Sequence, residues 1–259
     1  MSSLICDLRT DKVLQSIREG KRIDGRKFDE YRKLSVERNI SENAEGTARV
    51  RLGETDVIVG VKILPMTPFP DTPDSGSLSV GAEFSPIASS TFESGPPSAE
   101  SIELSRVVDR GIRESKCIDF EEWSIEPGKY AWNAFVDIYP INHDGNLFDA
   151  AAIASIIALL DSKMPKFEDG KVVKGEFKGK VKLSRKPILC TFSKIGNAIV
   201  SDATFAEERA QSARFSVAVN EDEYFSAFQK GGLGSFTASE IDTALDTALK
   251  NSKELRKLI

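Results

Sequence analysis

The sequence predicts an α+β fold made of two similar units. Segments that alternate between apolar and polar residues, which is typical of strands, are followed by helical segments, and this order occurs twice along the chain. Between the two occurrences lies a basic stretch, 163–186, with nine basic residues, three acidic residues and glycines that disfavour a helix. The pattern indicates an internal duplication of one α+β unit, although no repeat is evident at the level of single residues.

The basic stretch also marks the expected division of the chain. We expect an N-terminal helix and charged turn at 1–32, a first α+β unit at 33–162, a basic linker or hairpin at 163–186, and a second α+β unit at 187–259. The basic stretch is interpreted as solvated, because no aromatic platform accompanies its lysines. Contact with nucleic acid is the less favoured alternative for it.

The first half combines strands with a buried helix. A short helix is expected at 10–20, with Thr10 as its N-cap and Gly20 as its stop, followed by a charged turn at Asp24-Gly25. Residues 148–160 are apolar on nearly every side, which indicates a buried helix of about three turns rather than a membrane span. Strands are expected at 34–40, 47–52, 55–64, 77–84 and 130–141.

The second half repeats this order with a longer helix at its end. Thr237 and Glu240 form a capping box that begins a final helix, which runs to about Leu258. Strands are expected before it, at 187–193, 198–204, 213–220 and 223–229.

The segment 97–117 is the element around which the first unit is organised. Its spacing predicts an amphipathic helix that begins after Ser98, the expected N-cap. The apolar face collects Leu104, Val107, Val108, Gly111 and Ile112. This face is expected to pack on the core.

The opposite face of this helix carries an arginine stripe, defined as Arg106, Arg110 and Arg113. Three guanidinium groups on one exposed face could hold successive phosphates of a nucleic-acid strand. Spacing alone favours the simpler interpretation of a solvated face, in which Glu103 pairs with Arg106 and Asp109 pairs with Arg113.

Composition limits the classes of function. The 259 residues have a net charge of −5 and a pI near 5.2, so any nucleic-acid contact must be local. Three distant cysteines and a single histidine, His143, exclude a Cys/His zinc site within this chain, and no Walker or dinucleotide loop is present. We therefore expect no metal and no cofactor. The chain has no leader-like start and no apolar run of membrane length, so we expect a cytoplasmic protein without membrane contact.

Two motifs stand out when they are taken together. The first is the run from Arg22 to Arg26, Arg-Ile-Asp-Gly-Arg, and the second is 46–57, Gly-Thr-Ala-Arg-Val-Arg-Leu-Gly-Glu-Thr-Asp-Val. In combination they resemble the RNase PH family of phosphorolytic 3′ to 5′ exoribonucleases, and the resemblance continues at 103–113, 215–220 and 228–231. It implies an RNase PH-like fold, similar to ribosomal S5 domain 2, with six units closed into a ring through which RNA is threaded and cut by inorganic phosphate.

The expected phosphate site departs from the family pattern. Active members carry Asp-Gly-Gly-Thr-Arg at the start of the buried helix, where backbone N–H groups, a hydroxyl and a guanidinium hold phosphate. The matching run here is 144–149, Asp-Gly-Asn-Leu-Phe-Asp. Leu147 and Phe148 can donate nothing to phosphate. Asp149 is expected to repel an anion and to occupy the positive helix end itself.

The second acidic site departs as well. Glu208 falls on the earlier acidic position of active members, but Arg214 falls where the later aspartate should be. A guanidinium does not give up its proton at neutral pH, so Arg214 cannot act as a general acid. We expect Glu207 and Glu208 to be a solvated pair without a catalytic role.

The arginine stripe fits the arginines with which the family contacts RNA. The resemblance therefore implies a non-catalytic RNase PH-like subunit, of the kind found in the core ring of the archaeal exosome. Its expected partners are a catalytic RNase PH-like subunit, alternating three plus three in the ring, RNA-binding cap proteins and single-stranded RNA. Two alternatives stay open: an active enzyme that holds phosphate through Arg49 or Arg51, and a purely structural ring member.

Overall fold

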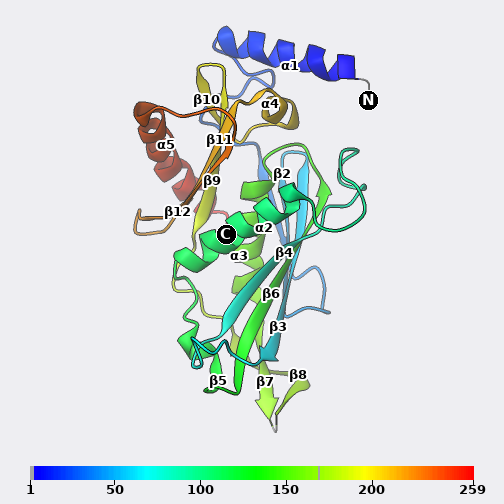
Figure 1. Ribbon diagram of the computed structural model, residues 1–259, viewed down its shortest axis with the longest axis vertical. Coiled ribbons are helices and arrows are strands. Elements are labelled where there is room, and N and C mark those ends of the chain that lie inside the picture. Colours follow the sequence, from blue (N-terminus) through cyan, green and yellow to red (C-terminus); the bar gives the residue numbers. More distant parts are fainter. Residues whose placement is uncertain (1–2, 169) are drawn as a thin grey trace.

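A six-stranded sheet forms the first layer of the computed structural model, which describes residues 3–168 and 170–259 (Figure 1). Its strands are β1 (Leu34–Arg38), β2 (Gly46–Leu52), β3 (Thr55–Met66), β4 (Ser77–Ala82), β5 (Ser124–Glu126) and β6 (Tyr130–Asn142). The order is β1-β2-β3-β6-β4, with β5 paired to β6, and only β4 runs parallel to its neighbour. A short 3₁₀ helix, η1 (Glu121–Trp123), precedes β5.

The sequence pattern of β3 explains how this sheet faces the core. Val57, Val59, Val61 and Ile63 alternate along the strand and none of them is exposed, as the period of two requires. The other face of the sheet is partly open to solvent: Leu64, Phe135 and Tyr139 are about 40% exposed there. The predicted first-unit strands are confirmed, with ends that differ by a few residues.

Two helices, α2 (Ala99–Glu114) and α3 (Leu147–Asp161), form the second layer. Helix α3 contacts β2 and β3 on one side and β9 of the second sheet on the other, which explains why its sequence is apolar all round. Helix α2 begins as predicted, because the Ser98 side chain accepts a hydrogen bond from the Ser101 N–H. Its predicted apolar face is buried.

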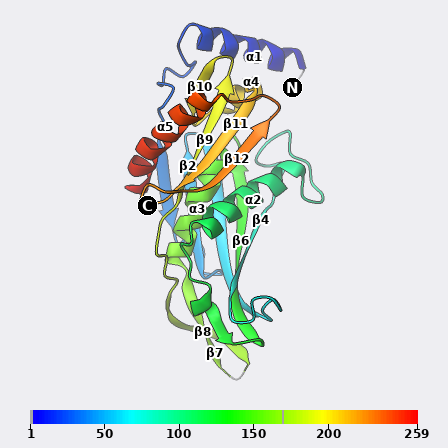
Figure 2. The same cartoon turned by 60° about the vertical axis from the view of Figure 1, so that its left-hand side comes forward.

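A four-stranded sheet and a helix form the third and fourth layers (Figure 2). The strands are β9 (Ile188–Ile195), β10 (Ala198–Ser201), β11 (Ala213–Val219) and β12 (Phe225–Gly232), in the order β10-β9-β11-β12. Helix α5 (Ala238–Arg256) packs on β9 and β11, and the predicted capping box of Thr237 and Glu240 is present at its start.

Helix α4 (Phe205–Ala210) was missed by the sequence prediction, which continued a strand to residue 204. The strand β10 ends at Ser201, and Thr204 begins α4 through a capping box with Glu207. The signal was present in the sequence, but a helix of six residues has too little apolar periodicity to reveal itself.

The N-terminal helix α1 (Ser3–Arg18) is longer than predicted. Thr10 lies inside it, so its assignment as the N-cap is wrong; no proline or glycine between Ser3 and Thr10 interrupts the helix. Val13 and Ile17 pack with Ile195 and Val200 of the second sheet, and Gly20, at a φ of +76°, follows the helix end as expected.

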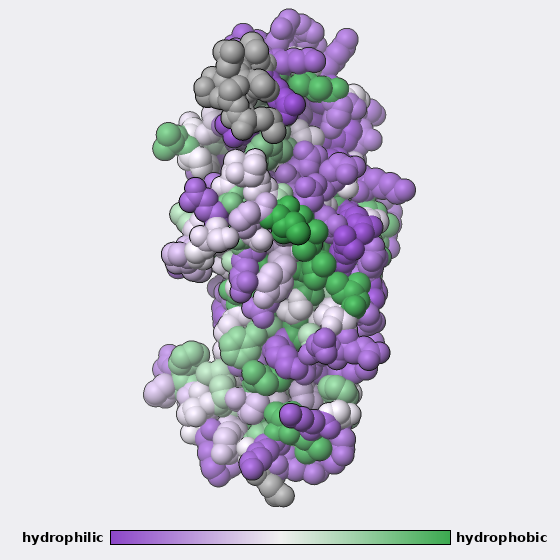
Figure 3. Space-filling view, turned by 90° about the vertical axis from the view of Figure 1, so that its right-hand side faces the viewer, coloured by the Kyte–Doolittle hydropathy of each residue, from purple (hydrophilic) through white to green (hydrophobic). Residues whose placement is uncertain are grey.

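Strands β7 (Lys163–Glu168) and β8 (Lys171–Lys180) form a separate hairpin. It extends from the end of the molecule opposite to α1 (Figure 1). The side of the molecule seen in Figure 3 shows hydrophilic residues near both ends and hydrophobic residues between them. Within the ranges 3–168 and 170–259, no helix is long and apolar enough to cross a membrane.

Candidate functional site

A hollow of about 360 Å³ lies where the N-terminal ends of α2 and α3 face α4 and β11. Leu147 and Phe148 of the expected phosphate site line it, together with Glu208 and Arg214 of the expected acidic site. The two segments in which the sequence departs from active members of the RNase PH family therefore meet in one place.

Arg214 fills one wall of this hollow. Its guanidinium carbon lies 3.9 Å from the centroid of the Phe148 ring, and the same guanidinium pairs with the Glu103 carboxylate of α2. The Arg214 side chain is only 13% exposed. A cation stacked on an aromatic ring and neutralised by a carboxylate thus stands beside the start of α3, where an active member would hold an anion.

Three of the backbone donors at the start of α3 are already engaged, those of Gly145, Asn146 and Asp149. Asn146, the N-cap, donates its backbone N–H to Oε1 of Glu208 at 2.8 Å, and its side chain accepts from the Asp149 N–H. The Gly145 N–H points to Nδ1 of His143 at 3.3 Å. A phosphate at this helix end would compete with the Glu208 carboxylate for the same donor.

Glu208 and His143 are both shifted toward their uncharged forms within the hollow. Desolvation raises the pKa of Glu208 to about 7, although the hydrogen bond from the Asn146 backbone opposes the rise. Desolvation and the Arg32 charge lower the pKa of His143 to about 4, so its ring is neutral at pH 7. Nε2 of His143 lies 3.8 Å from Oε2 of Glu208.

The expectation that Glu207 and Glu208 are a solvated pair is wrong. Glu207 is 3% exposed and accepts two hydrogen bonds from Arg22, at 2.8 and 2.6 Å. The Glu208 side chain is 19% exposed and bonded to Asn146. The two carboxylates point to different partners because they lie on a short helix whose N-terminal end is enclosed by the first unit and the 22–32 segment.

Replacement of Glu208 by glutamine is expected to flatten the pH dependence of stability. A folded-state pKa of about 7, against 4.5 for the free carboxyl, means that the folded state binds this proton more tightly, so stability falls as the pH rises from about 4.5 to 7. Glutamine keeps the acceptor for Asn146 and removes the titration. Urea unfolding measures this difference. Between pH 5 and pH 8 the free energy of unfolding of the wild type should fall by about 1–3 kcal/mol more than that of the variant.

The comparison of the two proteins removes the contribution of other groups. Desolvation raises the pKa of Asp149 to about 6, but Asp149 titrates in both proteins, so it does not affect the difference between their pH dependences. Equal pH dependence in the wild type and the Glu208→Gln variant would contradict the raised pKa of Glu208.

Asp149 does not lie where the sequence suggested. It is unexposed and points away from the hollow, where it accepts hydrogen bonds from the Tyr31 hydroxyl at 2.7 Å and the Thr191 N–H at 3.0 Å. The expectation that this carboxylate repels an anion at the helix end is therefore wrong. The acidic side chain that faces the hollow at that end is Glu208.

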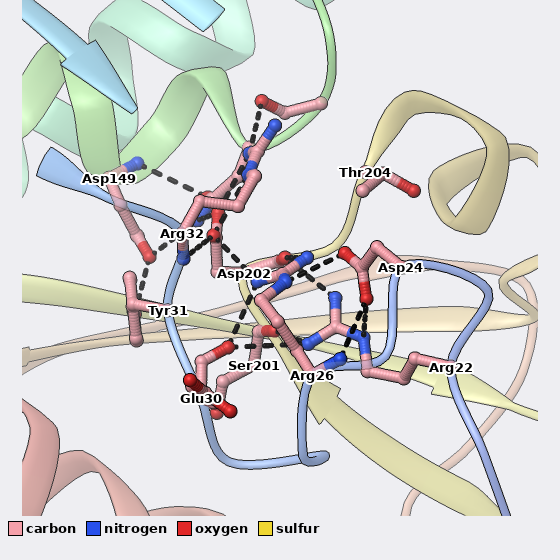
Figure 4. A network of polar contacts seen from close by, with 12 residues as sticks. Arg22, Asp24, Arg26, Glu30, Tyr31, Arg32, Asp149, Ser201, Asp202 and Thr204 are labelled. Atoms are coloured by element: carbon pink, nitrogen blue, oxygen red, sulfur yellow. Dashed lines mark hydrogen bonds and ion pairs between the residues drawn. The ribbon is translucent and has the colours of Figure 1, made fainter. Parts of the chain in front are cut away.

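A buried ionic network joins the 22–32 segment to both sheets (Figure 4). Asp202, on the turn after β10, accepts hydrogen bonds from Arg26, from the Arg32 backbone and side chain, and from the Asn146 amide, at 2.8–2.9 Å. Arg22 donates to the Ser201 and Asp202 carbonyls as well as to Glu207. The Arg22 to Arg26 motif thus has a structural role, which its charge alone did not reveal.

The arginine stripe on α2 is exposed, as expected, but its three members differ. Arg113 binds Asp109 at 2.8 and 3.1 Å and donates to the Leu78 carbonyl, and the hydrogen bond with Asp109 raises its pKa. Arg110 donates to the Gln229 side chain at 3.3 Å. Arg106 forms no ion pair within the described part of the chain, because Glu103, its expected partner, pairs with Arg214.

These arginines border a second hollow, of about 230 Å³, on the solvent side of α2. Of the three arginines, Arg106 and Arg110 are not neutralised by a carboxylate of the described residues and could bind an anionic ligand. Arg49 and Arg51, by contrast, both pair with Asp56 and do not line the α3 hollow. This pairing disfavours the alternative in which they hold phosphate. Among the described residues, no group of histidine, cysteine and carboxylate side chains is placed to hold a metal ion.

Two family models together match most of the chain. The chain matches domain 1 of the 3′ exoribonuclease family over residues 30–165 and domain 2 over 186–251. It belongs to this family, and the resemblance to RNase PH is confirmed.

Relatives with similar sequences belong to one group within this family, the exosome components. The chain is 44% identical over 260 residues to the exosome complex component Rrp42 of Thermococcus gammatolerans, in a match that covers 99% of this chain and 95% of that protein. The same component of Methanopyrus kandleri is 43% identical over 99% of this chain and 97% of that protein.

Solved structures agree with these relatives. A chain of the Archaeoglobus fulgidus exosome with RNA bound to the active site matches with a TM-score of 0.92 and 41% identity over 98% of both chains. Rice Rrp46 matches with a TM-score of 0.70 over 91% of this chain and 97% of that chain, but it is 18% identical and supports the fold alone. The predicted α+β fold of the RNase PH type is therefore confirmed.

Proposed function

We propose that this chain is a non-catalytic subunit of an exosome core ring, which binds single-stranded RNA and supports the active site of a catalytic RNase PH-like partner in 3′ to 5′ RNA degradation. The observation that carries the proposal is the occupation of the expected phosphate site by Phe148, Arg214 and Glu208. Its relatives named as exosome components, and the exosome structure with RNA bound, support the assignment.

Charge explains why phosphate would bind poorly in the hollow. Glu100, Glu103 and Glu208 line it together with Arg209 and Arg214, so acids outnumber bases. Arg214 is neutralised by Glu103, and the Asn146 N–H is taken by Glu208. Bringing in an anion would cost the hydrogen bonds of both carboxylates, and only Arg209, which lies over the Phe205 ring, carries a charge that no carboxylate in the described residues neutralises.

The two hollows would have different roles in the proposed ring. The hollow at the start of α3 would bind no phosphate and carry out no reaction, whereas the arginine stripe would hold the RNA backbone near the active site of the alternating catalytic subunit. RNA-binding cap proteins would complete the assembly. A cytoplasmic site of action is consistent with this substrate. We also propose that 163–186 divides the two family domains, which is supported by the separate sheets on either side.

Reconstitution tests the proposal. The purified chain, incubated with single-stranded RNA and inorganic phosphate, is expected to release no nucleoside diphosphates, whereas a mixture with its catalytic partner is expected to degrade the RNA faster than the partner alone. An Arg214→Ala variant should leave the rate of the mixture unchanged, because its hollow does no chemistry. Phosphorolysis by the isolated chain would contradict the proposal.

A further inference from the structure

We propose that the basic hairpin is a second binding surface for single-stranded RNA, separate from the arginine stripe. The basic hairpin is described at residues 163–168 and 170–182, which comprise β7, Gly170, β8 and the two residues that follow β8. The inference rests on the proposed function for the identity of the ligand, a single-stranded polyanion.

The basic hairpin reverses the charge of the molecule locally. The whole chain carries −5, but residues 163–182 hold seven lysines against three acids. Lys166 pairs with Glu168 and Glu176, and Lys180 lies 3.7 Å from Asp161. The other lysines are exposed and form no ion pair within the described residues: Lys163, Lys171, Lys174, Lys178 and Lys182. Such a cluster attracts a polyanion even though the protein as a whole repels one.

An exposed aromatic ring accompanies these lysines, contrary to the sequence interpretation. Phe177 of β8 is 45% exposed, and Nζ of Lys163 lies 5.4 Å from the centroid of its ring. Phe167 of β7 behaves differently, since it packs against Tyr130 and Trp132 of the first sheet. Phe167 therefore anchors the hairpin, and Phe177 is left without a core partner.

An aromatic face among unpaired cations is the arrangement with which proteins hold single strands, because bases stack on the ring and phosphates meet the cations. A bulge in β8 lies beside Phe177. The pairing register jumps between Pro165 and Lys166, so residues 174–176 have no counterpart on β7, and all three are exposed. Lys174 is carried on this bulge, next to Gly175 at a φ of +79°.

A salt titration of RNA affinity tests the inference. The probe is a fluorescein-labelled single-stranded RNA, measured on the full chain and on the ring reconstituted with its partner. The triple variant Lys171→Glu, Lys174→Glu and Lys178→Glu is expected to bind more weakly and to reduce the log–log salt slope by about 0.7 for each phosphate that is no longer bound, or about 2 for three phosphates. The Phe177→Ala variant should bind about tenfold more weakly with the slope unchanged.

The matched control replaces three exposed lysines elsewhere, Lys12, Lys21 and Lys27, by glutamate. This control should leave the log–log salt slope of RNA binding within error of the wild-type slope. A Lys→Gln triple at positions 171, 174 and 178 should reproduce the smaller slope without reversed charge. Circular dichroism establishes that each variant is folded.

Failure of this inference is distinguishable from failure of the proposed function. A slope equal to that of the wild type in the hairpin triple, while stripe variants bind RNA more weakly, would overturn the inference and leave the proposed function standing. Failure of ring assembly with RNA affinity of the chain unchanged would instead make the hairpin a protein-binding surface, which also overturns it. No RNA binding by the wild-type ring would refute both.

Discussion

Replacement of Asp202 by alanine is expected to lower the free energy of unfolding by about 3–5 kcal/mol, because it removes a fully buried carboxylate from an ionic network. The Asp202 side chain is unexposed and binds Arg26 and Arg32, whose side chains are 11% and 9% exposed. Without it, Arg26 keeps only the carboxylate of Asp24 and Arg32 keeps only that of Asp144 at 3.4 Å, and the Asn146 amide loses an acceptor. Urea denaturation at pH 7 measures the loss.

The effect should depend on pH in a defined direction. Desolvation alone would raise the pKa of Asp202, but hydrogen bonds and the charge of Arg32 outweigh it, and the net pKa is lowered. A carboxyl with a lowered folded-state pKa contributes stability above its unfolded pKa of about 3.9 and loses it as the pH falls further. The difference between wild type and Asp202→Ala should therefore be full near pH 7 and shrink below about pH 4.

The control is the exposed pair of Glu126 and Lys129, both more than half exposed. Glu126→Ala should change stability by less than about 1 kcal/mol. An Asp202→Ala variant that is no less stable than Glu126→Ala would show that the network does not join the two sheets in solution.

Reversal of Arg106 and Arg110 to glutamate is expected to weaken RNA binding by the reconstituted ring and to reduce the log–log salt slope by about 1.4, or 0.7 for each single-strand phosphate contact. Arg113 should contribute less, because its guanidinium is held by Asp109 and the Leu78 carbonyl. The Arg113→Glu variant alone is therefore expected to change the slope by less than either of the other single variants.

The control reverses the charge of Arg9 and Arg18, two exposed arginines of α1, which gives the same change in net charge on a different helix, at one end of the molecule (Figure 1). If the slope responds equally to this control, binding reflects net charge rather than the stripe. If it responds to neither, the chain has only a structural role in the ring, with its arginines facing acids of a neighbour.

The sequence was most informative where one physical signal dominates. The alternation of β3 and the all-round apolar pattern of α3 predicted their elements, because burial on one face or on every face leaves a clear period. The start of α1 was not predicted, because Thr10, a residue type favoured at N-caps, lies inside the helix. The existence of α4 was not predicted, because six residues carry little periodicity.

The chemistry of the site was predictable in composition but not in pairing. Set beside the pattern of active RNase PH members, Leu147, Phe148 and Arg214 predicted that the phosphate site is missing. Arg214 stacks on Phe148 and pairs with Glu103, so Glu103 does not pair with Arg106. These contacts join residues more than 60 positions apart in the chain, and no local pattern encodes them. For the same reason, the burial of Glu207 by Arg22 was not foreseen.

The mutual packing of Phe148, Arg214 and Glu103 makes these three residues hard to replace one at a time. An aspartate placed at position 214 would face Glu103 across the space that the guanidinium now neutralises, and the Phe148 ring would lose its covering cation. A different wall for this hollow would therefore require several residues to change together, because each single change alone is unfavourable. The present arrangement thus resists single substitutions.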